Sequence, residues 1–161
     1  MKVRHAVRAI MLDDDDRILL CRMALGPPGA CLWITPGGGI EDGESKSEAL
    51  RRELLEETGF VLGSLIPPHV WRREAPAPPG MIGYDATVSD FFLVRTQAFT
   101  PRGALSDDAL AAENITGFRW WPPAEIAAYD GPDVFSPRDL ATPLAALLAA
   151  GVPDTPLLLA S

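Results

Sequence analysis

The sequence contains few of the features on which membrane-spanning and disulfide-stabilised proteins depend. Its 161 residues include only two cysteines, Cys21 and Cys31, and no run of about 18 apolar residues that could span a membrane. The first residues carry charge and lead into a short apolar run that contains Arg8, unlike a secretory signal peptide. We therefore expect two reduced thiols in a cytoplasmic protein without a membrane partner.

Positive charge is also scarce, which argues against one large class of partners. The chain has 14 Lys and Arg residues against 22 Asp and Glu residues, and its net charge is −8. Proteins that bind nucleic acids neutralise the phosphate backbone with Lys and Arg, so we expect no nucleic-acid partner. A small phosphorylated ligand stays compatible with this charge, because carboxylates can recruit divalent cations that in turn bind phosphates.

Length and composition predict one globular domain over residues 1–161. A chain of this size can bury roughly two thirds of the surface that its unfolded form exposes, so it needs neither a metal nor a disulfide merely to fold. With 47% of its residues hydrophobic, the composition is that of a globular protein. We expect the last residues, about ten in number, to form a tail whose leucines, Leu157–Leu159, fray or pack against a second subunit of a homodimer.

Strand and helix patterns alternate along the chain. Two apolar runs, 6–12 and 17–22, flank four aspartates at 13–16 and predict a β-hairpin with a solvated acidic turn. Further strands are expected at 32–34, 60–66, 70–74, 86–96 and 115–121, and helices at 45–58, about 123–129 and 136–150. Irregular structure is expected at 26–30, 36–39 and 101–114, the last with one helical turn, and the Pro-rich segment 75–80 cannot be a central strand. This order predicts an α/β or α+β sandwich.

The helix expected at 45–58 carries a cluster of like charges. Glu53, Glu56 and Glu57 stand at i, i+3 and i+4, so their carboxylates share one face. Their repulsion costs about 0.2–0.5 kcal/mol per exposed pair, and the helix dipole disfavours negative charge near the C-terminal end. One interpretation is a solvated helix face. The other is a metal site, because converging oxygens suit Mg²⁺, which completes its shell with water and substrate phosphates.

The surrounding residues are compatible with the metal site. Leu50 and Leu54 form an apolar pair that can seat the helix on the core. Arg52 lies four residues before Glu56 and can orient carboxylates without binding metal itself. The glycines at Gly37–Gly39 allow close approach of the backbone, whose carbonyls could bind the metal and whose amides could contact phosphate.

The spacing of these residues resembles the Nudix box. Gly38 is followed after five residues by Glu44, after seven more by Arg52-Glu53-Leu54, and then by Glu56-Glu57 and Gly59-Phe60. Seven fixed identities, each with a background frequency of roughly 6–7%, would coincide by chance about once in 10⁸ starting positions. Segment 38–60 matches at every defined position, so the chain is identified as a member of the Nudix superfamily of MutT-like hydrolases.

This resemblance implies a fold, a cofactor and a set of roles. The implied fold is a Nudix-type α/β/α sandwich with a mixed central sheet, and the implied cofactor is Mg²⁺ or Mn²⁺. The implied metal ligands are Glu53, Glu56, Glu57 and a carbonyl of Gly37 or Gly38. Arg52 and Glu44 would brace these ligands, and Gly59 would end the helix. The number of metal ions stays open.

The family hydrolyses nucleoside diphosphates linked to another moiety, so the resemblance implies an enzyme that cleaves a diphosphate linkage by attack of water on phosphorus. Metal ions would neutralise the anionic diphosphate and lower the pKa of a bound water. A carboxylate outside the metal shell would then take the proton. Glu113, just before the strand expected at 115–121, is the candidate base. Glu53 or Glu57 could act instead, and Glu113 could equally be an exposed acid without a role.

Residues that contact the substrate are harder to choose. Trp33 is one of four tryptophans that could stack on a nucleobase, although a place in the core is the commoner explanation for each of them. Arg22, Arg72 and Arg73 could contact phosphates, although solvation is the commoner explanation for any one of them. We take Trp33, Arg22 and Arg72 as the candidate substrate-binding residues.

An ordinary or modified nucleoside triphosphate is the expected substrate. ADP-ribose or another nucleotide sugar is the alternative, but Pro76, near a position typical of some ADP-ribose-cleaving relatives, lies among many other prolines. Two other classes stay open: a non-catalytic Nudix module that senses a nucleotide, and an isomerase that acts on an isoprenoid diphosphate. Neither needs the complete set of box glutamates that this chain retains.

Overall fold

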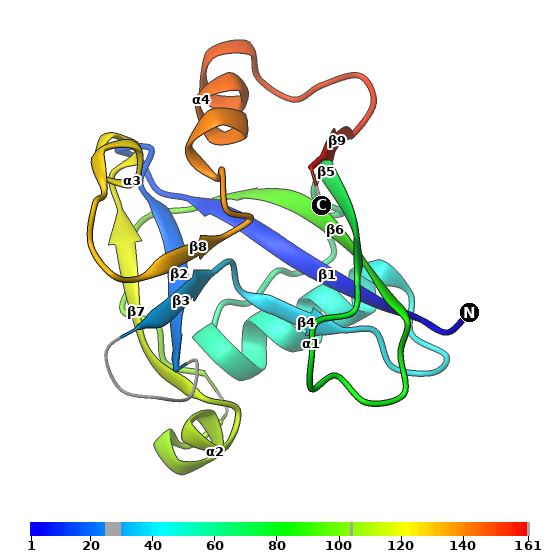
Figure 1. The fold of residues 1–161 in the computed structure, drawn as a ribbon. Coiled ribbons are helices and arrows are strands. Elements are labelled where there is room, and N and C mark those ends of the chain that lie inside the picture. The colour runs from blue at the N-terminus through cyan, green and yellow to red at the C-terminus, as the bar shows by residue number, and fades with distance from the viewer. Residues whose placement is uncertain (25–29, 104, 161) are drawn as a thin grey trace.

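The computed structural model describes residues 1–24, 30–103 and 105–160. Within these ranges the chain forms nine strands and four helices (Figure 1). The strands are β1 (Val3–Leu12), β2 (Ile18–Ala24), β3 (Cys31–Ile34), β4 (Gly37–Gly39), β5 (His69–Pro76), β6 (Ala86–Arg95), β7 (Ile115–Trp121), β8 (Val134–Ser136) and β9 (Leu157–Leu159). The helices are α1 (Lys46–Thr58), α2 (Asp107–Ala112), α3 (Pro123–Ala128) and α4 (Ala141–Ala150). In this described part of the chain, every helix is too short or too polar to cross a membrane.

The described strands form one mixed sheet that divides into two arms. Its order is β8-β3-β2-β1-β6-β5-β9, with β4 added to β1 and β7 added to β2. Strands β1 and β2 pair only where their hairpin closes, at Leu12 and Ile18, because β2 pairs along the rest of its length with β3 and β7. Strand β1 pairs instead with β4 and, in parallel, with β6. The two arms therefore diverge from the hairpin and leave a cleft beside β4.

Helices cover both faces of this sheet. Side chains of β1 point alternately to opposite faces, as the pleat of a strand requires. Ile10 packs in one apolar cluster with Leu144 of α4, whereas Met11 packs in a second cluster with Leu50 and Leu54 of α1. Figure 1 accordingly shows α1 and α4 on opposite sides of β1. This arrangement confirms the predicted α/β/α sandwich with a mixed central sheet.

Most of the predicted elements are confirmed. The hairpin, the strands at 32–34, 70–74, 86–96 and 115–121, and the single turn of helix within 101–114 all form. Helix α1 begins with a reciprocal capping box, in which the Ser45 hydroxyl accepts from the amide of Glu48 and the Glu48 carboxylate accepts from the amide of Ser45. It ends at Gly59, whose φ of 78° is the left-handed conformation that glycine adopts most readily.

Three of the predicted segments are wrong. Residues 60–66 form no strand, because Gly63 turns the chain at a φ of 73°. Strand β6 is not available as a partner, since both its edges are already paired, with β1 and with β5. Gly37–Gly39 is not irregular but forms β4, since pairing with β1 uses only backbone groups. The last helix begins at Ala141 rather than 136, because Ser136 is paired with β3 as the end of β8.

Two further segments differ from the expectation. The acidic turn is not fully solvated: Asp13 is only 2% exposed, and its carboxylate accepts from the amide of Arg17 and from the Arg17 side chain. The expected tail Leu157–Leu159 forms β9, which pairs in parallel with β5. Of the expected loop 26–30, all but Ala30 lies outside the described residues.

Two neighbouring leucines of α1 provide a test of how this helix is anchored. Leu54 is fully buried, whereas Leu55 is 45% exposed. We expect Leu54→Ala to lower the free energy of unfolding by about 2–5 kcal/mol, because the core loses a side chain and gains a cavity. We expect Leu55→Ala to lower it by less than about 1 kcal/mol. Urea denaturation followed by circular dichroism measures both, and equal losses would contradict the packing described above.

Candidate active site

Helix α1 brings two of the predicted acids against the backbone of β4. The amide of Gly37 donates to the Glu57 carboxylate at 3.1 Å. A Cβ added to Gly38 would lie 2.5 Å from a carboxylate oxygen of Glu53. At Gly37 the φ of 145° and the nearby Val7 carbonyl oxygen leave no room for a side chain. Gly38 therefore makes room for the Glu53 carboxylate beside the backbone of β4, and Gly37 lets β4 lie against β1.

Arg52 links the acids of α1 to the loop that precedes the helix. Its guanidinium donates to both carboxylate oxygens of Glu44, at 2.7 and 2.9 Å. It also donates to Glu53 at 2.9 Å, to Glu56 at 3.4 Å and to the carbonyl of Gly39 at 3.0 Å. The bonds from Arg52 to Glu44, together with the amide of Glu41, lower the pKa of Glu44 to about 2. One planar cation thus orients three carboxylates, as a fork of fixed donors can.

Glu57 is the least solvated of the box acids. Its residue is 5% exposed, and its pKa is raised above the usual glutamate range, chiefly because burial penalises the charged form. Repulsion from Glu53 raises this pKa further, while the positive charge of Arg8 opposes the shift. Ionisation of both Glu53 and Glu57 is therefore unfavourable here, because the protein alone offsets their negative charges poorly.

These acids open onto the cleft between the two arms of the sheet, which has a volume of about 200 Å³. Glu53 and Glu57 line one wall together with β4, and Cys21, Met23 and Ile115 come from the other arm. Glu113, at the end of α2, also lines the cleft. Burial and the charges of Glu53 and Glu56 raise its pKa. The predicted candidate base thus faces the predicted metal ligands across one cleft.

The oxygen atoms at this cleft suit a hard divalent cation. Mg²⁺ binds through one or two carboxylates and completes its shell with waters and phosphates, and the repelling pair Glu53 and Glu57 supplies such carboxylates beside the Gly38 backbone. In the described ranges, no three His, Cys, Asp or Glu side chains form a ready-made metal cage. Glu56 bonds to Arg52 and its side chain is 37% exposed. It shares the helix face but would have to leave Arg52 to join the other two.

Comparison with known proteins agrees with this geometry. The model of the NUDIX domain family matches residues 2–140. The chain belongs to the Nudix family. The nucleoside triphosphatase NudI of Salmonella newport (strain SL254) is 31% identical over 124 residues, which are 74% of this chain and 83% of that protein. The chain is therefore an enzyme of the Nudix hydrolase class.

Solved Nudix structures share the fold. The solution structure of the E. coli ORF135 protein is 26% identical and has a TM-score of 0.66, covering 93% of this chain and 94% of that one. The NUDIX domain of Shewanella oneidensis NrtR, solved with ADP ribose, is 18% identical and has a TM-score of 0.64, covering 92% of this chain and 89% of that one. At this identity the second comparison shows the fold alone.

Two arginines beside the Nudix box were missed by the sequence reasoning. Arg8 is half-buried and donates to the carbonyls of Thr35 and Gly37, at 3.0 and 3.3 Å. Burial lowers the pKa of Arg8, and the charge of Glu57 opposes this shift. Arg4 precedes Arg8 by four residues, so the alternation of a strand places it on the same face of β1, and it also lines the cleft. Two arginines interrupting the apolar alternation of this strand were the signal that could have identified them.

The structure does not bring the three expected substrate-binding residues to the Nudix cleft. Trp33 is 8% exposed, donates to Asp133 at 2.9 Å and packs in the core. Arg22 lies between two cleft-lining residues of β2, so alternation directs it to the opposite face. Arg72 pairs with Glu74 at 3.1 Å and with Asp90 at 3.4 Å, which already neutralise its charge.

The raised pKa of Glu57 predicts a pH dependence of stability in metal-free protein. Folded protein keeps the Glu57 proton at pH values where the unfolded chain, with a glutamate pKa of about 4.3, has released it. Stability should therefore fall as pH rises from about 5 to about 9. Glu57→Gln cannot lose a proton at this position, so its stability should fall less over the same range.

Urea denaturation in the presence of a chelator measures this difference. Glu125→Gln is the matched control, since the Glu125 side chain is 54% exposed and we expect it to follow the wild type. Identical pH slopes for Glu57→Gln and the wild type would show that burial does not hold a proton on Glu57.

Proposed function

We propose that this Nudix hydrolase uses Mg²⁺ or Mn²⁺ to hydrolyse a diphosphate linkage of a nucleoside triphosphate. The observation that carries the proposal is that one cleft is lined both by the acids Glu53 and Glu57 and by the arginines Arg4 and Arg8. Carboxylates bind the cation, and arginines bind phosphate oxygens bidentately. The 31% identity to a relative named as a nucleoside triphosphatase supports this substrate class.

Glu53 and Glu57 would hold the metal, with a carbonyl of Gly37 or Gly38 beside them and with Glu56 as a third ligand. When bound, the metal supplies charge neutralisation and a water of lowered pKa. Glu56 would exchange its longer bond to Arg52, at 3.4 Å, for the metal, whereas Arg52 orients Glu53 through the bond at 2.9 Å. Fixed ligands of this kind tune affinity through their orientation.

The remaining residues of the cleft would position the phosphates and move the proton. Arg4 and Arg8 would bind the phosphate oxygens and hold the chain of phosphates in line for attack. Glu113 lines the same cleft as the acids, and its raised pKa makes its carboxylate a stronger base for the proton of the attacking water. Met23 and Ile115 are the apolar side chains of that wall and would limit access of bulk water.

The two thiols support a location for this reaction. Cys21 and Cys31 are both free, and Cys21 is buried. Free thiols persist in reducing compartments, so we propose that the enzyme acts in the cytoplasm.

The test is a panel of nucleotides with and without Mg²⁺, followed by release of phosphate or pyrophosphate. We expect nucleoside triphosphates to be hydrolysed only with the metal. Glu57→Gln should lower kcat at least about tenfold, because removing a liganding charge weakens metal binding, whereas Glu125→Gln should be unaffected. Turnover of Glu57→Gln near that of the wild type would reject the metal site. Hydrolysis of ADP-ribose without hydrolysis of any nucleoside triphosphate would contradict the proposed substrate class.

A second substitution tests the site without removing any acid. In Gly38→Ala the new methyl group would meet the Glu53 carboxylate, which is the flexible end of a side chain and would swing aside. We expect the fold to persist and Mn²⁺ affinity to fall by about tenfold, the low end of the effect of misplacing a metal-site residue. Calorimetric titration with Mn²⁺ measures the affinity.

The matched control is Gly117→Ala on β7, where a Cβ meets no atom of the described residues within 4 Å. This variant should bind Mn²⁺ like the wild type. Unchanged affinity in Gly38→Ala would show that Glu53 does not bind the metal from its observed position.

A further inference from the structure

A second hollow adjoins the metal-binding cleft and has a volume of about 310 Å³. Arg4, Arg8 and Ile34 line both spaces, so the two lie side by side. A volume of this size lies in the range of small-molecule sites, which starts at about 300 Å³. A substrate with its phosphates beside Glu53 and Glu57 would therefore extend its remaining part into this hollow.

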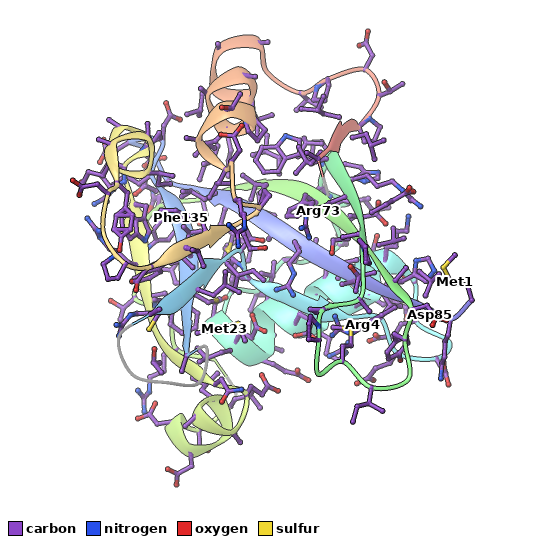
Figure 2. The ribbon with its side chains drawn as sticks, viewed as in Figure 1. Met1, Arg4, Met23, Arg73, Asp85 and Phe135 are labelled. Atoms are coloured by element: carbon purple, nitrogen blue, oxygen red, sulfur yellow. The ribbon has the colours of Figure 1, made fainter. Side chains whose placement is uncertain are left out.

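The floor of the hollow is the face of the sheet formed by β1, β6 and β5. In the strand register, Ala6 of β1 stands beside Ser89 of β6, and Ser89 stands beside Arg73 of β5. Phe91 lies two positions further along β6 on the same face. Figure 2 labels Arg4 and Arg73, which come from the two outer strands of this floor. The hollow is thus bordered by arginine on the strands at both sides.

The walls of the hollow are apolar. Leu32 and Ile34 of β3 line one side. Pro76, Pro78 and Met81 come from the end of β5 and the connection to β6, which crosses in front of β1 in Figure 1. Apolar walls suit the apolar faces of a planar ring, since ligand sites hold such groups largely by apolar contact. A nucleobase therefore fits this space better than a second phosphate group would.

Although the protein as a whole is acidic, the polar side chains of the hollow are arginines and hydroxyl groups. Its lining in the described residues includes arginines and hydroxyl groups but no Asp, Glu, Asn or Gln. The undescribed positions 25–29, 104 and 161 contribute none of these types either. Arginine only donates hydrogen bonds, whereas a hydroxyl donates or accepts. The side chains of this site therefore select, through arginine, for groups that accept hydrogen bonds.

Arg73 is anchored at one side of the hollow through its Nε atom. Its Nε donates to the carbonyl of Ala160 at 3.3 Å, and its strand neighbour Leu159 belongs to β9, which is paired with β5. Within the described residues the bond from Nε is the only hydrogen bond of the Arg73 side chain. The residue lines the hollow and also a second space beside α4 and β9. Arg8 and Arg4 lie on the side of the phosphates, so Arg73 is the arginine placed for the far end of the substrate.

We propose that the hollow binds the base of the substrate and that Arg73 selects keto bases over amino bases. Uracil, thymine, guanine and hypoxanthine present a carbonyl oxygen where cytosine and adenine present an amino group. The guanidinium can donate to the carbonyl, but it would meet the amino group donor to donor. This proposal deepens the proposed function and rests on it for the orientation of the phosphates.

The first arm of the test measures binding without metal or catalysis. Calorimetry compares UMP with CMP and IMP with AMP, pairs that differ at this carbonyl or amino position. We expect the wild type to bind the keto member at least about tenfold more tightly, the discrimination typical of one good arginine–base contact. In Arg73→Gln, whose amide both donates and accepts, the ratio should fall to near one. Arg95→Gln is the matched control, because Arg95 pairs with Asp16 at the surface and lies outside the hollow.

Several results would overturn the proposal. Equal binding of the two members by the wild type would do so, as would tighter binding of the amino member or binding of none of the four at millimolar concentration. Equal weakening of both members in Arg73→Gln would show that Arg73 acts as a charge for phosphate. The wild-type ratio is decisive on its own if Arg73→Gln does not fold.

The second arm separates this proposal from the proposed function. With Mg²⁺, kcat/KM for UTP should exceed that for CTP, and kcat/KM for ITP should exceed that for ATP, each at least about tenfold. Hydrolysis of all four at similar rates would overturn the base selection but keep the triphosphatase. Keto selectivity in binding without hydrolysis of any triphosphate would keep the base site but overturn the triphosphatase.

Discussion

The close contact between α1 and β4 is the constraint on which the rest of the site depends. The Gly37 amide donates to Glu57 at 3.1 Å. A side chain at Gly38 would meet the Glu53 carboxylate, and one at Gly37 would meet the backbone of β1. Burial of Leu50 and Leu54 holds the helix against the sheet, and the capping box and Gly59 set where it begins and ends. The packing thereby brings Glu53 and Glu57 together in a poorly solvated place, and in the proposed function a bound cation would offset the repulsion between their charges.

The distribution of charge is more informative than its sum. The net charge of −8 argues against a nucleic-acid partner, yet the hollow beside the acids is lined by three arginines and, in the described residues, by no carboxylate. The diverging arms of the sheet open the cleft in which both kinds of charge meet, because β1 leaves β2 after the hairpin and presents Arg4 and Arg8 to the opening. In the proposed function, an acidic protein would in this way present both a cation site and an arginine-lined surface to one anionic ligand.

Residues that act through their neighbours along the chain were predictable, and residues that act across the sheet were not. The spacing of Glu53, Glu56 and Glu57 follows from helix geometry, and Arg52 reaches its acids within the same helix and the loop before it. Trp33 and Arg72 had the right chemistry for a substrate site, but one lies in the core and the other is neutralised by Glu74 and Asp90. Their surroundings are formed by strands distant in sequence, which a local pattern does not reveal.

The sequence by itself determined the helix of the Nudix box, its capping, the acidic face and most strands of the mixed sheet, because periodicity, capping and glycine conformation are local properties. Only the tertiary structure decided that Gly37–Gly39 is a strand, that residues 60–66 are not, and that Leu157–Leu159 joins β5. Each of these depends on whether a strand edge is free nearby. The same holds for Arg4, Arg8 and Arg73, which line one hollow because neighbouring strands align them, not because they are close in sequence.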